Sequence, residues 1–149
     1  MNDVEKLLAL EEIRTLKARY WRFMDTKDWD ALRGVFSDDA AIDMTAANES
    51  AGKAAGGAQA VVDYIRDIVN DVQTVHQGHT SEIDFVSDTE ATGIWPMMDM
   101  LKWPEGSSRY GITVMNGWGH YHDRYKLTPD GWRISFTSVT RLRVDTDAE

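Results

Sequence analysis

A change of hydrophobic period close to His76 constrains the fold of this chain more than any other feature. Before that residue, apolar side chains recur mostly at the three- and four-residue spacing of amphipathic helices. After it, apolar and polar residues alternate, as they do in half-buried strands. Helices followed by strands predict an α+β fold in which three N-terminal helices cover one face of a curved antiparallel sheet. The length of 149 residues suits a single domain spanning residues 1–149.

The helical part divides into three segments, and the first is expected to be capped by Asn2 or Asp3. The expected helices are 3–23, 29–36 and 60–70. The break between the first two places Asp25 at a corner between helices rather than on a solvent face. Between the second and third helices, the Ala- and Gly-rich stretch 46–57 is expected to form a mobile rim.

The strands are expected at 40–45, 76–86, 89–103, 110–127 and 132–144. Residues 37–39 are expected to form a turn. Gly111, Gly117 and Gly119 lie inside one expected strand, where glycine often marks a bend or bulge. We therefore expect the sheet to be strongly curved around a pocket.

Charge and composition exclude several classes of partner. A net charge of -9 opposes a phosphate-binding surface, so nucleic acid is not an expected partner. The chain has no cysteine, which excludes thiolate metal sites and a thiol nucleophile. No stretch approaches the roughly 20 apolar residues of a membrane span. The charged amino terminus does not resemble a secretory signal, so we expect a cytoplasmic protein.

The polar segment from His76 to Asp84 leads directly into an apolar strand and suggests a polar cavity. We single out His79 as a base, because a neutral imidazole can remove a carbon-bound proton. Asp25 is the candidate for the carboxylate that orients His79. The residues alone leave the alternative that His79 bonds a neighbouring backbone group and Asp25 merely caps the second helix.

Other residues could line the same cavity. Tyr20 could bind a substrate oxygen or could be a core aromatic. Asp99 is expected on the same face of its strand as Trp95 and Met97. A carboxylate on such an apolar face indicates a bound partner or a function. The alternative is that Asp99 is exposed at a sheet edge. The methionines and tryptophans, including Met24, would give a deformable apolar lining for a bulky ring substrate or would simply build the core.

The remaining histidines have no assigned catalytic role. His76 and His79 point to opposite faces if the strand is unbroken. His120 and His122 share a face and could bind a metal, but no third ligand is evident nearby. We therefore expect no metal site and interpret these two as surface or interface residues.

Several segments together resemble the SnoaL-like branch of the nuclear-transport-factor-like superfamily, and most closely scytalone dehydratase and the bile-acid dehydratases. The resemblance covers nearly the whole chain. It rests on residues 20–25, 28–32, 78–80, 91–93, 123–125 and 131–134.

The resemblance implies a cone-shaped α+β fold, often trimeric, around a cofactor-free His–Asp dyad assisted by tyrosine. By resemblance, His79 matches the base, Asp25 its orienting carboxylate and Tyr20 the tyrosine that binds the substrate oxygen. Asp99 and Tyr121 fall on cavity strands, where they could contact substrate. His76, Gly78 and the 120–122 segment match no family role that we can assign.

The expected function is therefore that of a dehydratase acting on a hydroxylated, mostly apolar cyclic substrate, with His79 and Asp25 as the dyad and no cofactor. The alternatives are an isomerase or polyketide-cyclase-like enzyme with the same dyad, and a non-catalytic small-molecule-binding or accessory subunit. A homo-oligomer is expected, with a trimer favoured by the resemblance.

Overall fold

The computed structural model describes residues 1–107 and 111–148. The first helix, α1 (Asp3–Asp25), begins with a capping box in which the Asn2 side chain accepts from the backbone of Glu5, and the Glu5 side chain accepts from the backbone of Asn2. Of the two expected caps, Asn2 is therefore the one used. The helix continues two residues beyond its expected end and so includes Asp25. Among the described residues, no helix is both long and apolar enough to cross a membrane.

The second and third helices are short. The helix α2 (Trp29–Arg33) is capped by the Asp28 side chain and ends three residues before its expected end. The helix α3 (Ala58–Val69) begins two residues earlier than expected and buries one apolar face. The helix pattern therefore located all three elements, with small errors at their ends.

Within the described residues, the strands form one seven-stranded sheet. They are β1 (Phe36–Asp43), β2 (Lys53–Ala55), β3 (Gln73–Gly78), β4 (Glu82–Phe85), β5 (Glu90–Lys102), β6 (Ile112–Thr128) and β7 (Gly131–Ala148). Residues 37–39, expected as a turn, belong to β1, and the expected loose rim contains β2. Tyr110, the expected first residue of the strand that corresponds to β6, lies outside the described residues.

The strand order is β2-β1-β7-β6-β5-β3, and β4 also pairs with β5. The pair β1–β7 is parallel, whereas the other pairs are antiparallel. The expected antiparallel sheet is therefore a mixed sheet. A parallel pair needs a long connection, and here most of the chain lies between the two strands.

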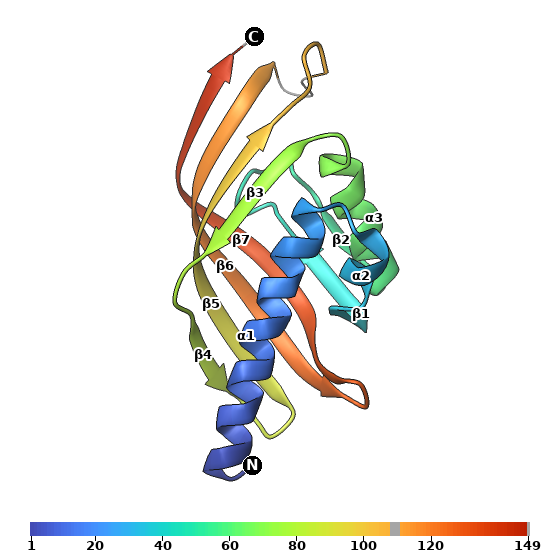
Figure 1. Cartoon of the computed structure of the whole chain (residues 1–149), viewed down its shortest axis with the longest axis vertical. Coiled ribbons are helices and arrows are strands. Elements are labelled where there is room, and N and C mark those ends of the chain that lie inside the picture. Colours follow the sequence, from blue (N-terminus) through green and yellow to red (C-terminus); the bar gives the residue numbers. More distant parts are fainter. Residues whose placement is uncertain (108–110, 149) are drawn as a thin grey trace.

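All three helices lie on one side of the curved, unclosed sheet, with α1 crossing it and α3 beside β1 (Figure 1). The hydrophobic core lies between these helices and the inner face of the sheet. The expected α+β cone fold is confirmed.

The expected strand 76–86 is interrupted. The strand β3 ends at Gly78, β4 begins at Glu82, and both pair with β5. Between them, the backbone N–H of His79 donates to the carbonyl of Pro96. Gly78 lies against the Trp21 ring, where a Cβ would come within 1.8 Å of a ring carbon. Trp21 therefore packs onto β3 only because residue 78 has no side chain.

Candidate functional site

A cavity of about 340 Å³ lies between the helices and the inner face of the sheet. Its wall is mostly apolar, with residues such as Met24, Leu101 and Met115 from three different elements. The wall also carries the polar side chains of Tyr20, His76, Asp99, Tyr121 and Arg141. An apolar cavity with a few convergent polar groups is the usual form of a small-molecule site.

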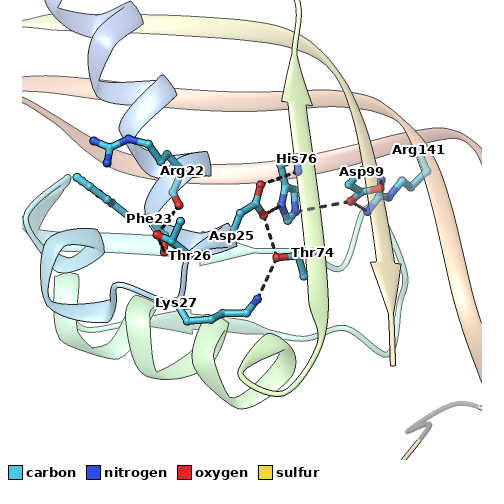
Figure 2. Close-up of polar contacts among 9 residues, drawn as sticks. All are labelled: Arg22, Phe23, Asp25, Thr26, Lys27, Thr74, His76, Asp99 and Arg141. Carbon is cyan, nitrogen blue, oxygen red and sulfur yellow. Dashed lines mark hydrogen bonds and ion pairs between the residues drawn. The ribbon is translucent and has the colours of Figure 1, made fainter. Parts of the chain in front are cut away.

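Asp25 and His76 form a close pair at this cavity (Figure 2). The His76 Nδ1 lies 2.6 Å from Asp25 Oδ1, and the backbone N–H of His76 donates to Asp25 Oδ2 over 2.8 Å. Asp25 is the last residue of α1, where the helix dipole disfavours a negative charge. Hydrogen-bond donors from β3 compensate for this position.

A third donor to Asp25 comes from Thr74, two residues before His76 on the same face of β3. The Thr74 hydroxyl donates to Asp25 Oδ1 over 2.8 Å and accepts from Lys27 Nζ over 2.9 Å. Lys27 adopts a left-handed backbone conformation, with φ 60°, just after α1 ends. Burial lowers the pKa of Lys27, although the Asp25 charge opposes this effect. Lys27 thus supports the Asp25 carboxylate through Thr74.

On its other side, the His76 ring faces Asp99. The His76 Nε2 lies 4.0 Å from Asp99 Oδ2, because the two residues are opposite each other in the β3–β5 register. Asp99 is 3% exposed, and both of its oxygens accept from Arg141, over 2.8 and 2.7 Å. Burial acts to lower the pKa of Arg141, but the bonds to Asp99 outweigh this effect and raise it. Such two-point pairing fixes both side chains.

Gly117 provides the space for this pair. It lies opposite Asp99 in the β5–β6 register, and a Cβ there would come within 2.4 Å of both Arg141 Nη1 and Asp99 Oδ1. The glycine therefore serves the site directly, rather than only bending the strand as the sequence suggested.

Two tyrosines complete the polar part of the wall. The rings of Tyr20 and Tyr121 meet edge to face, with centroids 5.8 Å apart. Burial raises the pKa of Tyr20 well above its ordinary value. Burial likewise raises the pKa of Tyr121, and the nearby Asp99 charge adds to the effect. Both hydroxyls therefore remain protonated at neutral pH. A hydrogen bond joins them, so one donates within the pair and the other can donate to a ligand.

Comparison with known proteins assigns the chain to a family. The family model described as a SnoaL-like domain matches residues 5–138. The chain belongs to the SnoaL-like family.

Solved structures agree with this fold. The chain is similar to hexachlorocyclohexane dehydrochlorinase (LinA) type 2, with a TM-score of 0.83 and 19% identity over 99% of this chain and 94% of that one. It is also similar to a scytalone dehydratase-like protein from Novosphingobium aromaticivorans, with a TM-score of 0.80 and 20% identity over 97% and 91%. At these identities the likeness shows the SnoaL-like fold alone.

The SnoaL-like resemblance predicted His79 as the partner of Asp25, but the structure places His76 there. His79 is exposed, lies beyond the end of β3 and does not contact Asp25, so the expected Asp25–His79 hydrogen bond is wrong. The inward positions of β3 are Thr74 and His76, and the imidazole bonded to Asp25 is His76. The two-residue period of the strand decides this choice, since residues 76 and 79 have opposite parity.

The other expected site residues divide into two groups. Tyr20, Met24, Asp99 and Tyr121 lie on the cavity wall. Trp95 and Met97 are buried but are not among its lining residues, which corrects their expected placement. The Trp95 ring packs against Trp21 of α1, and its Nε1 donates to the Tyr125 hydroxyl, so α1 covers this part of β5.

Sequence reasoning missed His76 and Arg141. The signal for His76 was the inward position of Asp99, because the residue paired with Asp99 on the next strand faces the same cavity. This signal requires the strand register, which the sequence alone does not supply. Arg141 carried no signal beyond its position in an expected strand.

His120 and His122 lie away from the cavity wall. Their rings are 6.4 Å apart, and His122 Nε2 is 2.9 Å from the Thr140 hydroxyl. Within residues 1–107 and 111–148, no group of three or more His, Asp or Glu side chains is arranged to hold a metal ion.

Proposed function

We propose that this protein is a cofactor-independent lyase that removes water from a hydroxylated, mostly apolar cyclic compound. The observation that carries the proposal is the 2.6 Å contact between His76 Nδ1 and Asp25 Oδ1 beside an apolar cavity. His76 takes the role first expected of His79, and Asp25 keeps its expected role as the orienting carboxylate.

Asp25 determines which nitrogen of His76 can act as the base. The ionised carboxylate only accepts hydrogen bonds, so the hydrogen of the neutral ring lies on Nδ1. The lone pair is then on Nε2, the nitrogen that faces Asp99 across 4.0 Å. A base fixed in one tautomer and orientation is the arrangement that general base catalysis requires.

The proposed reaction needs one proton carrier. His76 Nε2 removes a proton from the carbon next to a substrate carbonyl, and the electron pair of that C–H bond forms an enolate. Collapse of the enolate forms the carbon–carbon double bond and breaks the C–O bond of the β-hydroxyl. The departing oxygen takes the proton from the imidazolium and leaves as water, which returns His76 to its neutral form.

Charged groups around His76 favour the intermediate. The imidazolium would lie between Asp25 and Asp99, and Arg141 holds Asp99 in place. The hydrogen-bonded hydroxyls of Tyr20 and Tyr121 lie on the cavity wall, and this pair supplies the donor for the enolate oxygen. Proton transfer by a positioned base typically contributes about 10²–10⁴-fold, and hydrogen bonds to the oxygen add to this.

The cavity suits a substrate whose reacting end is uncharged. The Asp99 carboxylate compensates the charge of Arg141 through two hydrogen bonds, so the pair offers little attraction to a carboxylate or phosphate. The apolar wall suits a ring. The structural relatives named as a dehydrochlorinase and as scytalone dehydratase-like both suggest elimination reactions, which differ in the leaving group.

The test is a screen of cyclic β-hydroxy ketones and chlorinated rings, with products identified by mass spectrometry. Loss of water supports the dehydratase, loss of chloride a dehydrohalogenase, and an unchanged mass with a moved double bond or new ring an isomerase or cyclase. Activity that survives exhaustive chelation and dialysis would support independence from cofactors.

Matched histidine variants assign the base. His76→Gln and Asp25→Asn should lower kcat by about 100-fold or more, because each removes the base or its orientation. His79→Gln, with the same substitution at an exposed position, should leave kcat unchanged. If the parent protein turns over none of the ligands and all variants bind them equally well, the protein is a non-catalytic binding or accessory subunit and the lyase proposal fails.

We further propose that copies of the chain associate through the outer face of the sheet, away from the helices. Its central positions are Ile94, Pro96, Met98 and Met100 of β5, Asn116, Trp118, His120 and His122 of β6, and Ser138, Thr140 and Leu142 of β7. None of these eleven is Asp, Glu, Lys or Arg. Arg143 and Asp145 of β7, which pair with Trp118 and Asn116 on the same face, carry opposite charges and form an ion pair with each other. Because the chain carries a charge of -9, copies can approach each other best through such a neutral face.

Sedimentation velocity tests this association. The parent protein should sediment as an oligomer, with a trimer favoured by the family resemblance, and Leu142→Glu, at a side chain 77% exposed, should weaken it. A monomeric parent at high concentration would refute the proposal.

A further inference from the structure

A buried ion pair lies directly behind the two tyrosines of the cavity wall. Lys17 of α1 and Asp123 of β6 are 2.8 Å apart, and both side chains have an exposed fraction of 0%. Neither residue is on the cavity wall, so the proposed proton transfers do not use them.

The Asp123 carboxylate is fixed on several sides. It accepts from the Thr137 hydroxyl over 2.7 Å and from the Tyr125 hydroxyl over 2.7 Å. The Tyr125 hydroxyl in turn accepts from Trp95 Nε1 over 2.8 Å. Asp123 is therefore anchored to the sheet independently of Lys17.

The Lys17 ammonium is held mainly by charge and by aromatic faces. Its Nζ lies 3.7 Å from the centroid of the Tyr121 ring and 4.2 Å from that of Tyr20. Its contact with Asp123 is close, but it does not have the alignment of a hydrogen bond. Lys17 therefore joins the anchored carboxylate to the rings of both tyrosines.

Burying such an ion pair in the core is energetically unfavourable compared with burying apolar side chains. Removing two charges from water costs free energy that their attraction often does not recover, and apolar replacements of similar volume are frequently as stable. Burial lowers the pKa of Lys17, and its close interaction with Asp123 opposes this. A role at the neighbouring cavity would explain why the chain places these charges here.

We infer that Lys17 is a positioning residue that holds Tyr20 and Tyr121 and strengthens their hydroxyls as donors to a substrate oxygen. A cation against the face of a phenol attracts ring electrons, which makes the O–H on that ring a better donor to a negative oxygen. This inference rests on the proposed function, because it assumes that an enolate oxygen forms near the tyrosines.

The test uses the double variant Lys17→Met with Asp123→Asn, which removes both charges and keeps similar side-chain volumes. Lys6→Met is the matched control, since Lys6 is an exposed lysine of the same helix. Two probes are titrated into each protein. Naphthalene reports on the shape of the cavity, and 2-naphthol adds one hydroxyl that can take on negative charge.

The parent protein should bind 2-naphthol more tightly than naphthalene and should shift the absorption of the bound naphthol towards that of naphtholate. In the double variant, the preference for 2-naphthol should fall by about 3- to 30-fold, the range from an exposed to a desolvated cation–π contact, while naphthalene binding stays unchanged. Lys6→Met should retain the preference of the parent.

Equal weakening of both probes, or no weakening of either, would show a purely structural role and overturn the inference. A parent protein without preference for 2-naphthol would overturn it too. Should the double variant not fold, Lys17→Met alone is expected to lower the same preference, because Asp123 keeps its hydrogen bonds from Thr137 and Tyr125. A failed lyase proposal gives a different result, since the 2-naphthol preference would then persist while no substrate of the screen reacts.

Discussion

Replacing Gly117 by alanine is expected to separate Asp99 from Arg141. The new Cβ would lie 2.4 Å from one atom of each residue, whereas ordinary contacts of a Cβ begin near 3.4 Å. Each group would have to retreat by about 1 Å, the difference between these two distances. The hydrogen bonds between the pair, now 2.8 and 2.7 Å, would not survive such a displacement.

The cost can be estimated from two contributions. Overpacking of a tight interior costs about 1–3 kcal/mol. A hydrogen bond to a charged group contributes about 1.5–3 kcal/mol, part of which cavity water would restore. We expect the free energy of unfolding to fall by about 2–4 kcal/mol, or the melting temperature by roughly 5–15 °C for a chain of this size.

Urea unfolding followed by circular dichroism measures this change. Gly34→Ala is the control, because Gly34 is exposed and has a helical φ of -68°, so its effect should be about 0.5 kcal/mol or less. A Gly117→Ala protein within about 0.5 kcal/mol of the parent would show that the pair does not pack against this glycine.

Two further changes test the surroundings of the site. Gly78→Ala should destabilise the protein by about 1–3 kcal/mol in urea unfolding, because its Cβ would meet Trp21. The same substitution should cost much less when it is made in a Trp21→Leu protein and compared with that protein. Burial raises the pKa values of Tyr20, Tyr121 and Tyr125 above the ordinary 10.0, so the unfolded chain ionises first. Their contribution to stability should hold below about pH 10 and decline above it, and their tyrosinate absorbance should appear only on unfolding. Ionisation of all tyrosines in the folded protein near pH 10 would contradict this.

The helices and the inner face of β5 could be predicted because their signals are local. The box formed by Asn2 and Glu5 marks the start of α1, and alternation along β5 correctly placed Asp99 on the same side as Trp95 and Met97. Such patterns depend on residues close together in the chain, whose spacing the sequence states directly.

The pairing of strands could not be predicted in the same way. One of the two neighbours of β1 is β7, almost a hundred residues later, and the parallel direction of that pair has no local signature. The error at His79 has the same origin. The sequence predicts one unbroken strand from residue 76 to 86, although β3 ends at Gly78. Only the register with β5 shows that His76 faces Asp99.

The most direct test of the central claim is nitrogen-15 NMR of the histidine rings in the free protein. The hydrogen bond to Asp25 predicts that His76 carries its hydrogen on Nδ1, with a strongly deshielded proton that disappears in His76→Gln and shifts in Asp25→Asn. The same signal should persist in His79→Gln. A signal that is lost only in His79→Gln, or a His76 ring with its hydrogen on Nε2, would contradict the assignment of His76 as the base held by Asp25.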